Sequence, residues 1–285
     1  MKTTEFREFH TPSSGIFFRA RRRLLSERTP YQTIEVFETD SYGRVLLLDG
    51  LVQTTEKDEF FYHEMLVHPA MMSHPHPQDI LIVGGGDGGA LREVLRYPVK
   101  SAVLVEIDVR VIEVCRKRFP GLAASFGDHR VEVAVGDGNR YIRETDRLFD
   151  VIIVDSSDPV GPSAILHQKS FFAALKKRLR PGGTIAAQAG APLYHLEHLR
   201  KKRRFLKALF KSALYYLGPV PTYPGGLWCY VFLSERIDPL RPQRRRPPKK
   251  LRFYNLDVHR AAFALPEFLK DRARRQTGDL HGRSA

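Results

Sequence analysis

The stretch Ile80-Leu-Ile-Val-Gly-Gly-Gly-Asp-Gly-Gly89 runs from an apolar strand pattern directly into a glycine-rich loop. A short continuous apolar run is typical of a parallel strand that is buried on both faces. Glycines after such a strand let the backbone approach a ligand closely at the N-terminus of the next helix. The stretch therefore predicts a βα unit that binds a nucleotide, although the loop alone would suit many nucleotides.

Strand and helix patterns alternate from this unit toward the C-terminus. Further strands are expected at residues 101–106, 131–135, 149–154 and 184–188, and helices at 90–96, 109–118, 141–144 and 171–179. A run at 228–234 is expected to add an antiparallel edge strand. The alternation predicts an α/β fold with a Rossmann-like, doubly wound, mostly parallel sheet of the class I methyltransferase type.

The residues before this region have a different pattern, which predicts a small antiparallel β unit. Its strands are expected at residues 32–38, 45–48 and 52–55, with turns at 41–44 and 49–50. A helix is expected at 59–72, and the prolines of segment 73–78 should end it. We therefore expect an N-terminal β domain with a connecting helix at residues 1–72. A Rossmann-like catalytic domain is expected at 73–285, with a basic Pro-rich loop at 241–252.

The composition is typical of a large soluble protein. The chain has 285 residues, of which 42% are hydrophobic, enough for a core that needs no disulfides. Its two cysteines, Cys115 and Cys229, lack the spacing of a metal or redox site. No targeting signal is apparent, and no apolar run approaches the roughly 18 residues of a membrane span. These features predict a cytoplasmic protein that does not bind membranes.

A formal charge of +14 is the one bulk property that would suit a nucleic-acid-binding protein. The basic residues, however, gather in runs at 19–23, 200–204 and 241–250, with few aromatic residues between them for base stacking. We expect solvated surfaces and charged loops rather than a nucleic-acid site. The role of segments 200–204 and 241–252 stays open.

Acidic residues follow the expected strands at the edge where open α/β sheets bind their ligands. Glu106 closes the second strand, where a carboxylate can accept both hydroxyls of a ribose. Asp137 follows the third strand and could accept from an adenine amino group. Together they suggest an adenosine ligand, although either carboxylate could instead cap a helix.

Asp87 lies in the middle of the glycine-rich loop. A carboxylate there is unfavourable for a pyrophosphate or a ligand carboxylate, and favourable for a cation. Methyltransferases that use S-adenosylmethionine usually carry an acid two places before the first glycine of this loop, where the chain has Ile82. The change favours a donor that has lost its carboxylate and keeps an ammonium at the end of a propyl chain.

Two further carboxylates, Asp155 and Asp158, lie three residues apart after the fourth strand and can face one cation. A primary amine has a pKa of about 10.4, so it must lose a proton before it attacks a sulfonium-activated carbon. Asp155 is the expected general base. Asp158 is expected to position the amine, although Asp158-Pro159 could be only a turn.

Motifs along nearly the whole chain resemble those of the polyamine aminopropyltransferase family, which includes the spermidine synthases. They are Asp49-Gly50, Thr54-Thr-Glu-Lys-Asp-Glu-Phe60, Tyr62-His-Glu-Met65, Gly84-Gly-Gly-Asp-Gly-Gly89, Leu91-Arg-Glu93, Glu106-Ile-Asp108, Gly136-Asp-Gly138, Asp155-Ser-Ser-Asp-Pro159, Pro221-Thr-Tyr-Pro-Gly225 and the segment 253–266. The resemblance implies transfer of the aminopropyl group of decarboxylated S-adenosylmethionine, a co-substrate, to putrescine or a related amine. The second product would be 5′-methylthioadenosine. The resemblance further implies no separate cofactor, and a homodimer or homotetramer.

The resemblance also implies which residues form the site. Those expected at the donor are Gln32, Asp87, Glu106, Asp137, Gly138 and Pro162. Those expected at the amines are Tyr62, His63, Asp87, Asp155, Asp158, Gln188 and Tyr223. No metal site is expected, because the histidines near His63 lack the carboxylate or cysteine partners of such a site.

Two departures from the family pattern leave the acceptor open. Many relatives have a tryptophan near the start that walls the diamine site, and this chain has Phe6 and Phe9 there. No acidic residue follows Gln188 in Ala189-Gly-Ala-Pro192, unlike in some putrescine-specific members. Putrescine is the default acceptor, while cadaverine, agmatine or a longer polyamine would satisfy the same carboxylates.

Two other functions stay open. One is a methyltransferase that uses S-adenosylmethionine on nucleic acid, against which the position of Asp87 counts. The other is a non-catalytic relative that binds a polyamine or a nucleoside, against which Asp155 counts.

Overall fold

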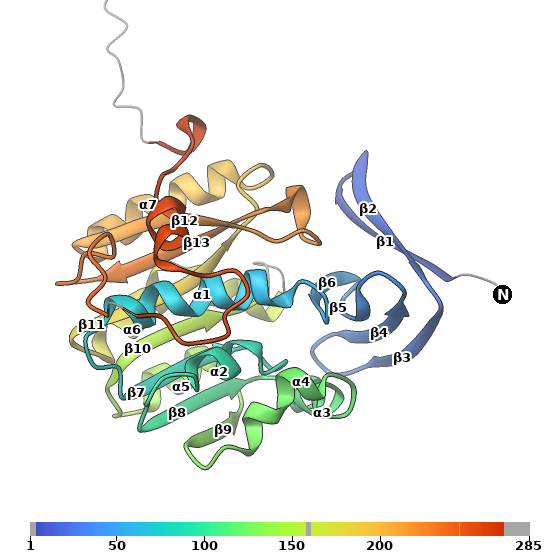
Figure 1. Cartoon of the computed structure of the whole chain (residues 1–285), viewed down its shortest axis with the longest axis horizontal. Helices are drawn as coiled ribbons and strands as arrows, with labels where there is room; N and C mark the ends of the chain where they lie inside the picture. Colours follow the sequence, from blue (N-terminus) through green and yellow to red (C-terminus); the bar gives the residue numbers. More distant parts are fainter. Residues whose placement is uncertain (1–3, 158–160, 245, 271–285) are drawn as a thin grey trace, which may run out of the picture.

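The computed structural model describes residues 4–157, 161–244 and 246–270, and a seven-stranded sheet forms its centre (Figure 1). The strands, in spatial order, are β12 (Ser212–Pro219), β13 (Leu227–Ser234), β11 (Leu179–Gly190), β10 (Phe149–Asp155), β7 (Asp79–Gly84), β8 (Ser101–Glu106) and β9 (Val131–Val135). The five strands from β11 to β9 are parallel, whereas β13 pairs antiparallel with β11 and with β12. The predicted Rossmann-like, mostly parallel sheet is confirmed.

The order of the strands determines where a ligand can bind. The chain runs outward from β7 to β9 and then returns to β10 on the other side of β7. The carboxyl ends of β7 and β10 therefore flank the topological switch point, where sheets of this class bind their ligands. One expectation is wrong: β13 is antiparallel but not the edge strand, because β12 pairs with its outer side.

Helices cover both faces of the sheet. They are α1 (Glu59–Ser73), α2 (Gly89–Val94), α3 (Val109–Arg118), α4 (Pro120–Ala123), α5 (Gly138–Glu144), α6 (Lys169–Lys177), α7 (Leu196–Leu209) and α8 (Leu256–Ala262), with 3₁₀ turns η1 (Ala124–Gly127), η2 (Gly161–His167), η3 (Pro224–Gly226) and η4 (Glu267–Leu269). Side chains alternate across strand β7: Ile80 and Ile82 join the core under α1 and α2, whereas Leu81 and Val83 join the core under α5 and α6. Both faces of β7 are therefore buried, as its apolar sequence predicts.

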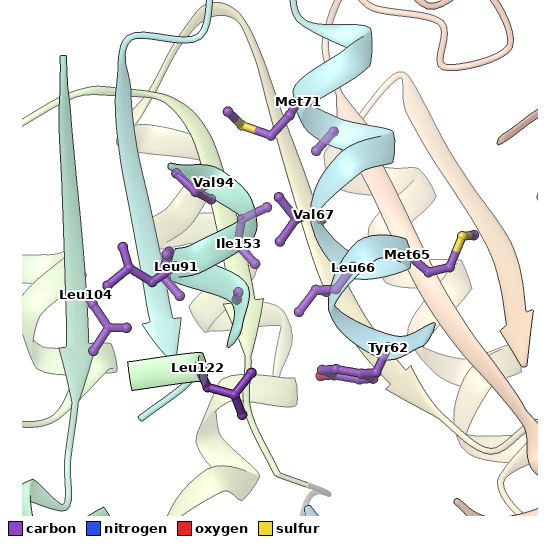
Figure 2. Close-up of a cluster of buried hydrophobic side chains, with 14 of the residues drawn as sticks. Tyr62, Met65, Leu66, Val67, Met71, Leu91, Val94, Leu104, Leu122 and Ile153 are labelled. Atoms are coloured by element: carbon purple, nitrogen blue, oxygen red, sulfur yellow. The ribbon is translucent and has the colours of Figure 1, made fainter. Parts of the chain in front are cut away.

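Helix α1 packs on the large sheet. Its Leu66 and Val67 are buried together with Leu91 and Val94 of α2 and Ile153 of β10 (Figure 2). Full burial of one aliphatic side chain of this size stabilises the fold by roughly 1.5–3 kcal/mol. This packing places the N-terminal end of α1, which begins at Glu59, near the switch point of the sheet. A domain boundary between residues 72 and 73 stays a prediction.

The N-terminal residues form two antiparallel sheets, so the predicted N-terminal β unit is confirmed. Strands β3 (Arg22–Arg28), β4 (Thr33–Thr39), β5 (Gly43–Leu48) and β6 (Leu51–Thr55) pair in order, and β1 (Thr4–Thr11) and β2 (Ser14–Ala20) form a separate hairpin. Phe6 stacks on Phe18 within the hairpin and on Phe37 of β4, which holds the hairpin against the larger sheet. Asp49 and Gly50 both have positive φ, as a two-residue hairpin turn requires.

Lys202 differs from the solvated charges expected of its segment, and Arg252 packs on an aromatic ring. Lys202, in the run 200–204, is only 1% exposed, and its Nζ lies 3.3 Å from Nδ1 of His167. The guanidinium of Arg252 lies 3.7 Å from the ring centre of Phe60, and its backbone N–H donates to buried Glu64 at 2.8 Å. Long basic side chains can pack their apolar stems in this way, so the solvated interpretation is wrong for Lys202, whereas Arg252 packs on a ring but stays exposed.

Crossing a bilayer would take a longer and more apolar helix than any found in the described residues.

Candidate active site

One cavity opens at the carboxyl ends of β7, β8 and β10 and contains most of the predicted site. Its lining includes Gln32, Tyr62, His63, Asp87, Glu106, Asp137, Gly138, Asp155, Gln188 and Tyr223. Asp158 lies outside the described residues, and of Pro162 only the backbone, in η2, is described. The structure therefore brings every other predicted site residue to one place.

The glycines of the loop make room for two side chains of the site. A Cβ atom on Gly86 would lie 2.8 Å from a carboxylate oxygen of Glu106. A Cβ atom on Gly89 would lie 2.2 Å from Cε1 of His63, well inside contact distance. Gly89 is the first residue of α2, so this helix can begin beside the histidine only without a side chain there.

Glu106 is held by the backbone around it. Its Oε2 accepts from Gly86 N at 3.1 Å, and its Oε1 accepts from Asp108 N at 3.0 Å. Burial raises the pKa of Glu106 to about 7 even though these N–H groups favour the carboxylate. Each oxygen keeps a second lone pair, so the carboxylate can still accept the two hydroxyls of a ribose.

Asp108, which the sequence analysis noted only within a motif, ties the two parts of the chain together at the cavity. Its side chain caps α3 by accepting from Arg110 N at 3.1 Å. The same carboxylate accepts from Gln32 Nε2 at 3.0 Å and from Thr29 Oγ1 at 2.7 Å. The segment between β3 and β4 is thereby fixed against the carboxyl end of β8, with Gln32 in the cavity wall.

Asp137 caps helix α5. This is the second of the two roles that the sequence left open for it, the first being a contact with adenine. It accepts from Asn139 N at 2.7 Å and from Arg140 N at 3.4 Å at the start of α5. Both bonds use Oδ1, so the capping role does not occupy Oδ2. The next residue, Gly138, has no room for a side chain, because a Cβ atom there would lie 2.4 Å from a methyl group of Val83.

Asp155 lies at the end of β10 and accepts a hydrogen bond of 2.7 Å from the hydroxyl of Tyr62. Burial raises the pKa of Asp155 to about 6; the charge of His63 and the Tyr62 bond lower it, and the charge of Asp87 raises it. Burial also raises the pKa of Tyr62 well above its usual value, so the phenol stays a donor. Asp155 can therefore take up and release a proton near neutral pH.

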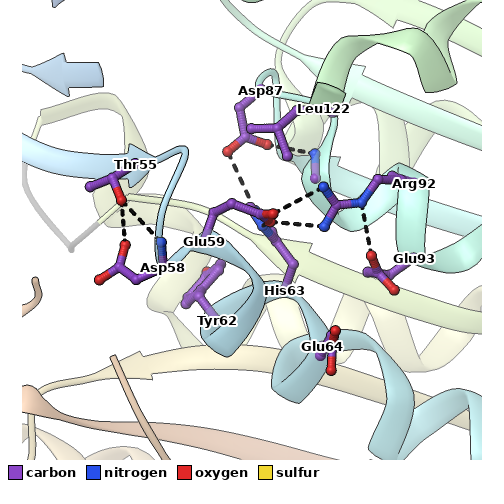
Figure 3. Close-up of polar contacts among 12 residues, drawn as sticks. Thr55, Asp58, Glu59, Tyr62, His63, Glu64, Asp87, Arg92, Glu93 and Leu122 are labelled. Carbon is purple, nitrogen blue, oxygen red and sulfur yellow. Dashed lines mark hydrogen bonds and ion pairs between the residues drawn. The ribbon is translucent and has the colours of Figure 1, made fainter. Parts of the chain in front are cut away.

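His63 lies between two carboxylates (Figure 3). Its Nδ1 is 2.8 Å from Glu59 Oε2, and its Nε2 is 3.3 Å from Asp87 Oδ2. Burial alone would lower the pKa of His63, but Asp87 and Glu59 raise it well above the usual value of about 6.5. His63 is thus an imidazolium. The sequence analysis expected Asp87 to favour a cation, and in the structure Asp87 pairs with His63.

The same geometry bears on metal binding. One ligand atom each of His63, Asp87 and Asp155 lies within 4.8 Å of the others. The reason given above for expecting no metal is wrong for His63, because Glu59 and Asp87 flank it. An imidazolium has no free lone pair to offer a metal, so this arrangement suits an organic cation better.

Gln188 and Tyr223 line the cavity near the residues that follow Asp155 and near Tyr62. Gln188 Nε2 donates to the carbonyl oxygens of Ser156 at 2.9 Å and Ser157 at 3.1 Å. Its Oε1 is buried and has no hydrogen-bond partner among the described residues. The ring of Tyr223 lies 5.5 Å from that of Tyr62, and its hydroxyl donates to the carbonyl of Gln53. Tyr62 and Tyr223 thus form an aromatic part of the cavity wall.

Glu8 is a cavity residue that the sequence analysis missed. It is 4% exposed and lines the cavity from β1, where its Oε2 accepts from Val52 N at 2.8 Å and its Oε1 lies 3.3 Å from His10 Nε2. Phe6 and Phe9, which replace the tryptophan of many relatives, do not line the cavity: Phe6 packs into the N-terminal core, and Phe9 is 65% exposed. Strand alternation, which places residues 6, 8 and 10 on one face, was the signal that could have identified Glu8.

Comparisons with known proteins agree with this geometry. The family model described as "Spermine/spermidine synthase domain" matches residues 59–241, and the one described as "Spermidine synthase tetramerisation domain" matches residues 5–56. The polyamine aminopropyltransferase of Moorella thermoacetica is 42% identical over 273 residues, which cover 95% of this chain and 96% of the relative. That of Bacillus mycoides is 44% identical over 268 residues, which cover 93% and 98%.

Solved structures are similar over the same length. A spermidine synthase in complex with the transition state analogue AdoDATO has a TM-score of 0.90 and 40% identity, with 93% of each chain covered. The spermidine synthase from Thermotoga maritima has a TM-score of 0.88 and 39% identity, with 93% of this chain and 92% of that chain covered. Since the match extends through the N-terminal sheets, the seven-stranded sheet and the cavity, the chain belongs to the spermine/spermidine synthase family of polyamine aminopropyltransferases.

Proposed function

We propose that the chain transfers the aminopropyl group of decarboxylated S-adenosylmethionine to the primary amine of a diamine. In this reaction the amine nitrogen attacks the propyl carbon next to the sulfonium. A carbon–nitrogen bond forms, the carbon–sulfur bond breaks, and its electron pair returns to sulfur to give 5′-methylthioadenosine. The nitrogen loses one proton. With putrescine as acceptor the other product is spermidine.

The observation that carries the proposal is Asp155, a carboxylate with a raised pKa that faces the cavity under a hydrogen bond from Tyr62. Asp155 accepts the proton that the attacking amine must lose. A carboxylate with a pKa of about 6 stays mostly ionised at neutral pH and is still a stronger base than an ordinary aspartate. The fixed Tyr62 hydroxyl keeps the accepting carboxylate in one orientation.

The donor occupies the part of the cavity between the glycine loop and strand β8. Glu106 accepts the ribose hydroxyls, Gln32 and Pro162 contact the nucleoside, and Asp137 with Gly138 contacts the adenine. Asp87 receives the donor's ammonium group, which then shares the carboxylate with the His63 imidazolium. A donor that kept its carboxylate would meet the negative charge of Asp87 instead.

The acceptor occupies the part between the aromatic side chains and Gln188. Tyr62 and Tyr223 contact its methylene groups, and Gln188 lines the same part of the cavity. Asp158 positions the reacting amine, and Glu8 at the far end pairs with the second ammonium. This assignment favours a diamine over a monoamine, with putrescine as the first candidate and cadaverine, agmatine or a longer polyamine as the others.

We also infer a homodimer or homotetramer, supported by the match of residues 5–56 to a tetramerisation domain. Light scattering on the purified chain measures this directly. A cytoplasmic location is a further proposal, supported by two buried cysteines that form no disulfide.

The test is product analysis with a panel of diamines and polyamines and with either decarboxylated S-adenosylmethionine or S-adenosylmethionine as donor. The expected result is equimolar 5′-methylthioadenosine and aminopropylated amine from the decarboxylated donor. Absence of methylthioadenosine with every amine would favour a non-catalytic binding protein. Methyl transfer to nucleic acid would favour the methyltransferase alternative, which none of the relatives reported above supports.

A further inference from the structure

A chain of charged side chains of alternating sign leads from the cavity into the interface between α1 and α2 (Figure 3). Asp87 pairs with His63, and His63 pairs with Glu59 at the distances given above. Glu59 accepts two hydrogen bonds from Arg92, at 3.0 Å from Nη1 and 2.8 Å from Nη2. The Nε of Arg92 donates to Glu93 at 2.8 Å. Arg92 is thus the fixed cation behind the pair that faces the cavity.

Burial makes this cation necessary. The side chains of Glu59 and Glu93 are 7% and 0% exposed, and that of Arg92 is 24% exposed. Burial alone would raise the pKa of Glu59 and of Asp87, but the pKa of each is lower than usual because His63 and Arg92 lie nearby. Two parallel N–H bonds to one carboxylate also fix its orientation, which a single point charge would not do.

We propose that Arg92 is a positioning residue for donor binding: through Glu59 it fixes His63, and it keeps the Asp87 carboxylate ionised at the cavity. The inference rests on the proposed function, because it takes Asp87 as the carboxylate that receives the donor's ammonium group. Arg92 itself does not line the cavity.

Three other titratable groups interact electrostatically with Asp87. They are Asp155 at the end of β10, Tyr223 after β12 and Cys115 of α3. Burial raises the pKa of the phenol and of the thiol, so both are neutral, and Asp155 is neutral or negative. None of these three groups can replace the positive charges of His63 and Arg92.

The chain offers a matched control for Arg92. Arg96 also pairs with Glu93, at 2.5 Å, and its side chain is 29% exposed, close to the 24% of Arg92. Its ion pair is with Glu93, one step farther from the cavity than Glu59. The Arg92→Gln and Arg96→Gln variants therefore remove the same charge from the same buried glutamate, and only the first removes a cation from Glu59.

The experiment is calorimetric titration of the full chain with decarboxylated S-adenosylmethionine, without acceptor, between pH 3 and 7, because the pKa of Asp87 lies below the usual value of about 3.9. Loss of a nearby cation raises the pKa of Asp87, and a protonated Asp87 cannot pair with an ammonium. In Arg92→Gln the affinity for the donor should therefore begin to fall at a pH roughly half a unit or more above that of the wild type. This shift corresponds to about threefold weaker binding at a given pH below the pKa of Asp87. Arg92→Lys, which keeps the charge, should restore most of the wild-type profile, and Arg96→Gln should match the wild type.

An Arg92→Gln profile equal to that of the wild type overturns the inference, and so does an equal shift in Arg96→Gln. If Arg92→Gln does not fold, Glu59→Gln tests the same chain through the NMR titration of His63. The pKa of His63 should fall when the charge of Glu59 is removed, and an unchanged titration overturns the inference. This titration needs no donor, so it distinguishes failure of the charge chain from failure of the wild type to bind the donor, which would refute the proposed function.

Discussion

The hydroxyl of Tyr62 donates a hydrogen bond of 2.7 Å to Asp155, which joins helix α1 to the end of strand β10 at the cavity. Tyr62 is buried, so water does not compete for its hydroxyl. The bond favours the ionised carboxylate, whereas burial favours the neutral one, and burial has the larger effect. The proton affinity of Asp155 is thus a balance of two opposing effects, each of which a single substitution can change.

Asp155→Asn removes the proposed base. Turnover should fall by roughly 10²–10⁴-fold, as expected for loss of a general base, and the affinity for the donor should change little. Single-turnover kinetics and donor titration measure the two quantities separately. Unchanged turnover would exclude Asp155 from the reaction.

Tyr62→Phe should shift the pH profile of turnover. Asp155 works as a base only when ionised, so activity is present above its pKa and is lost as the pH falls through it. The Tyr62 bond lowers that pKa, so its removal should raise the pKa above about 6 and move the acid limb of kcat to higher pH. The loss of a hydrogen bond to a charged group is worth roughly 1.5–3 kcal/mol. An acid limb at the wild-type position would mean that another group sets it.

Asp87→Asn should narrow the preference for the decarboxylated donor over S-adenosylmethionine. The neutral amide no longer repels the carboxylate of S-adenosylmethionine, and it binds the ammonium of the decarboxylated donor more weakly. The ratio of the two dissociation constants is the measurement. Asp137→Asn is the control: asparagine also caps helices, so this change should affect both donors equally. A ratio that does not change in Asp87→Asn would contradict the charge argument.

Glu8→Gln should weaken binding of the acceptor without changing the affinity for the donor. Loss of a charge-assisted hydrogen bond to the second ammonium is worth about 1.5–3 kcal/mol, or roughly ten- to a hundredfold in KM for putrescine. Glu5→Gln is a matched control, because Glu5 lies on the same strand but is exposed. Equal effects of the two changes would show that Glu8 does not contact the acceptor.

Glu93→Gln should lower the free energy of unfolding by roughly 1.5–3 kcal/mol at pH 7, because it removes a buried carboxylate that pairs with the partly exposed Arg92 and Arg96. Burial would raise the pKa of Glu93, but His68, Arg92 and Arg96 lower it to about 2. A depressed carboxyl pKa stabilises the fold above the unfolded value of about 4.3, and this stabilisation is lost as the pH falls toward 2. The difference between variant and wild type in urea unfolding should therefore shrink over that range. A constant difference would mean that packing, not charge, makes Glu93 stabilising.

The parts of the site that lie at strand ends could be predicted from the sequence, because one rule places them. Glu106 and Asp155 each close an apolar strand pattern, and parallel strands bring such residues to one edge of the sheet. Asp137 follows the same rule, but it also satisfies the rule for helix caps, and the structure shows the cap. Sequence position alone cannot distinguish two roles that need the same residue at the same place.

Contacts between distant elements could not be predicted in this way. Glu59 and Arg92 meet only because α1 and α2 pack together, and the pattern of neither helix indicates it. Strand β1 was not predicted, and buried Glu8 was not noticed among the charged residues of the segment 4–11. Lys202 was taken for surface charge within a basic run, because its burial depends on how α7 packs.

The absence of a side chain at Gly89 has a consequence for how this site can change over time. A Cβ atom there would overlap the ring of His63, so substitution at position 89 and retention of the histidine are mutually exclusive. A variant library randomised at both positions should yield active clones with alanine or serine at 89 only where a smaller residue replaces His63. The two positions would then vary as one unit, and the imidazolium would persist only in lineages that keep the first residue of α2 as glycine.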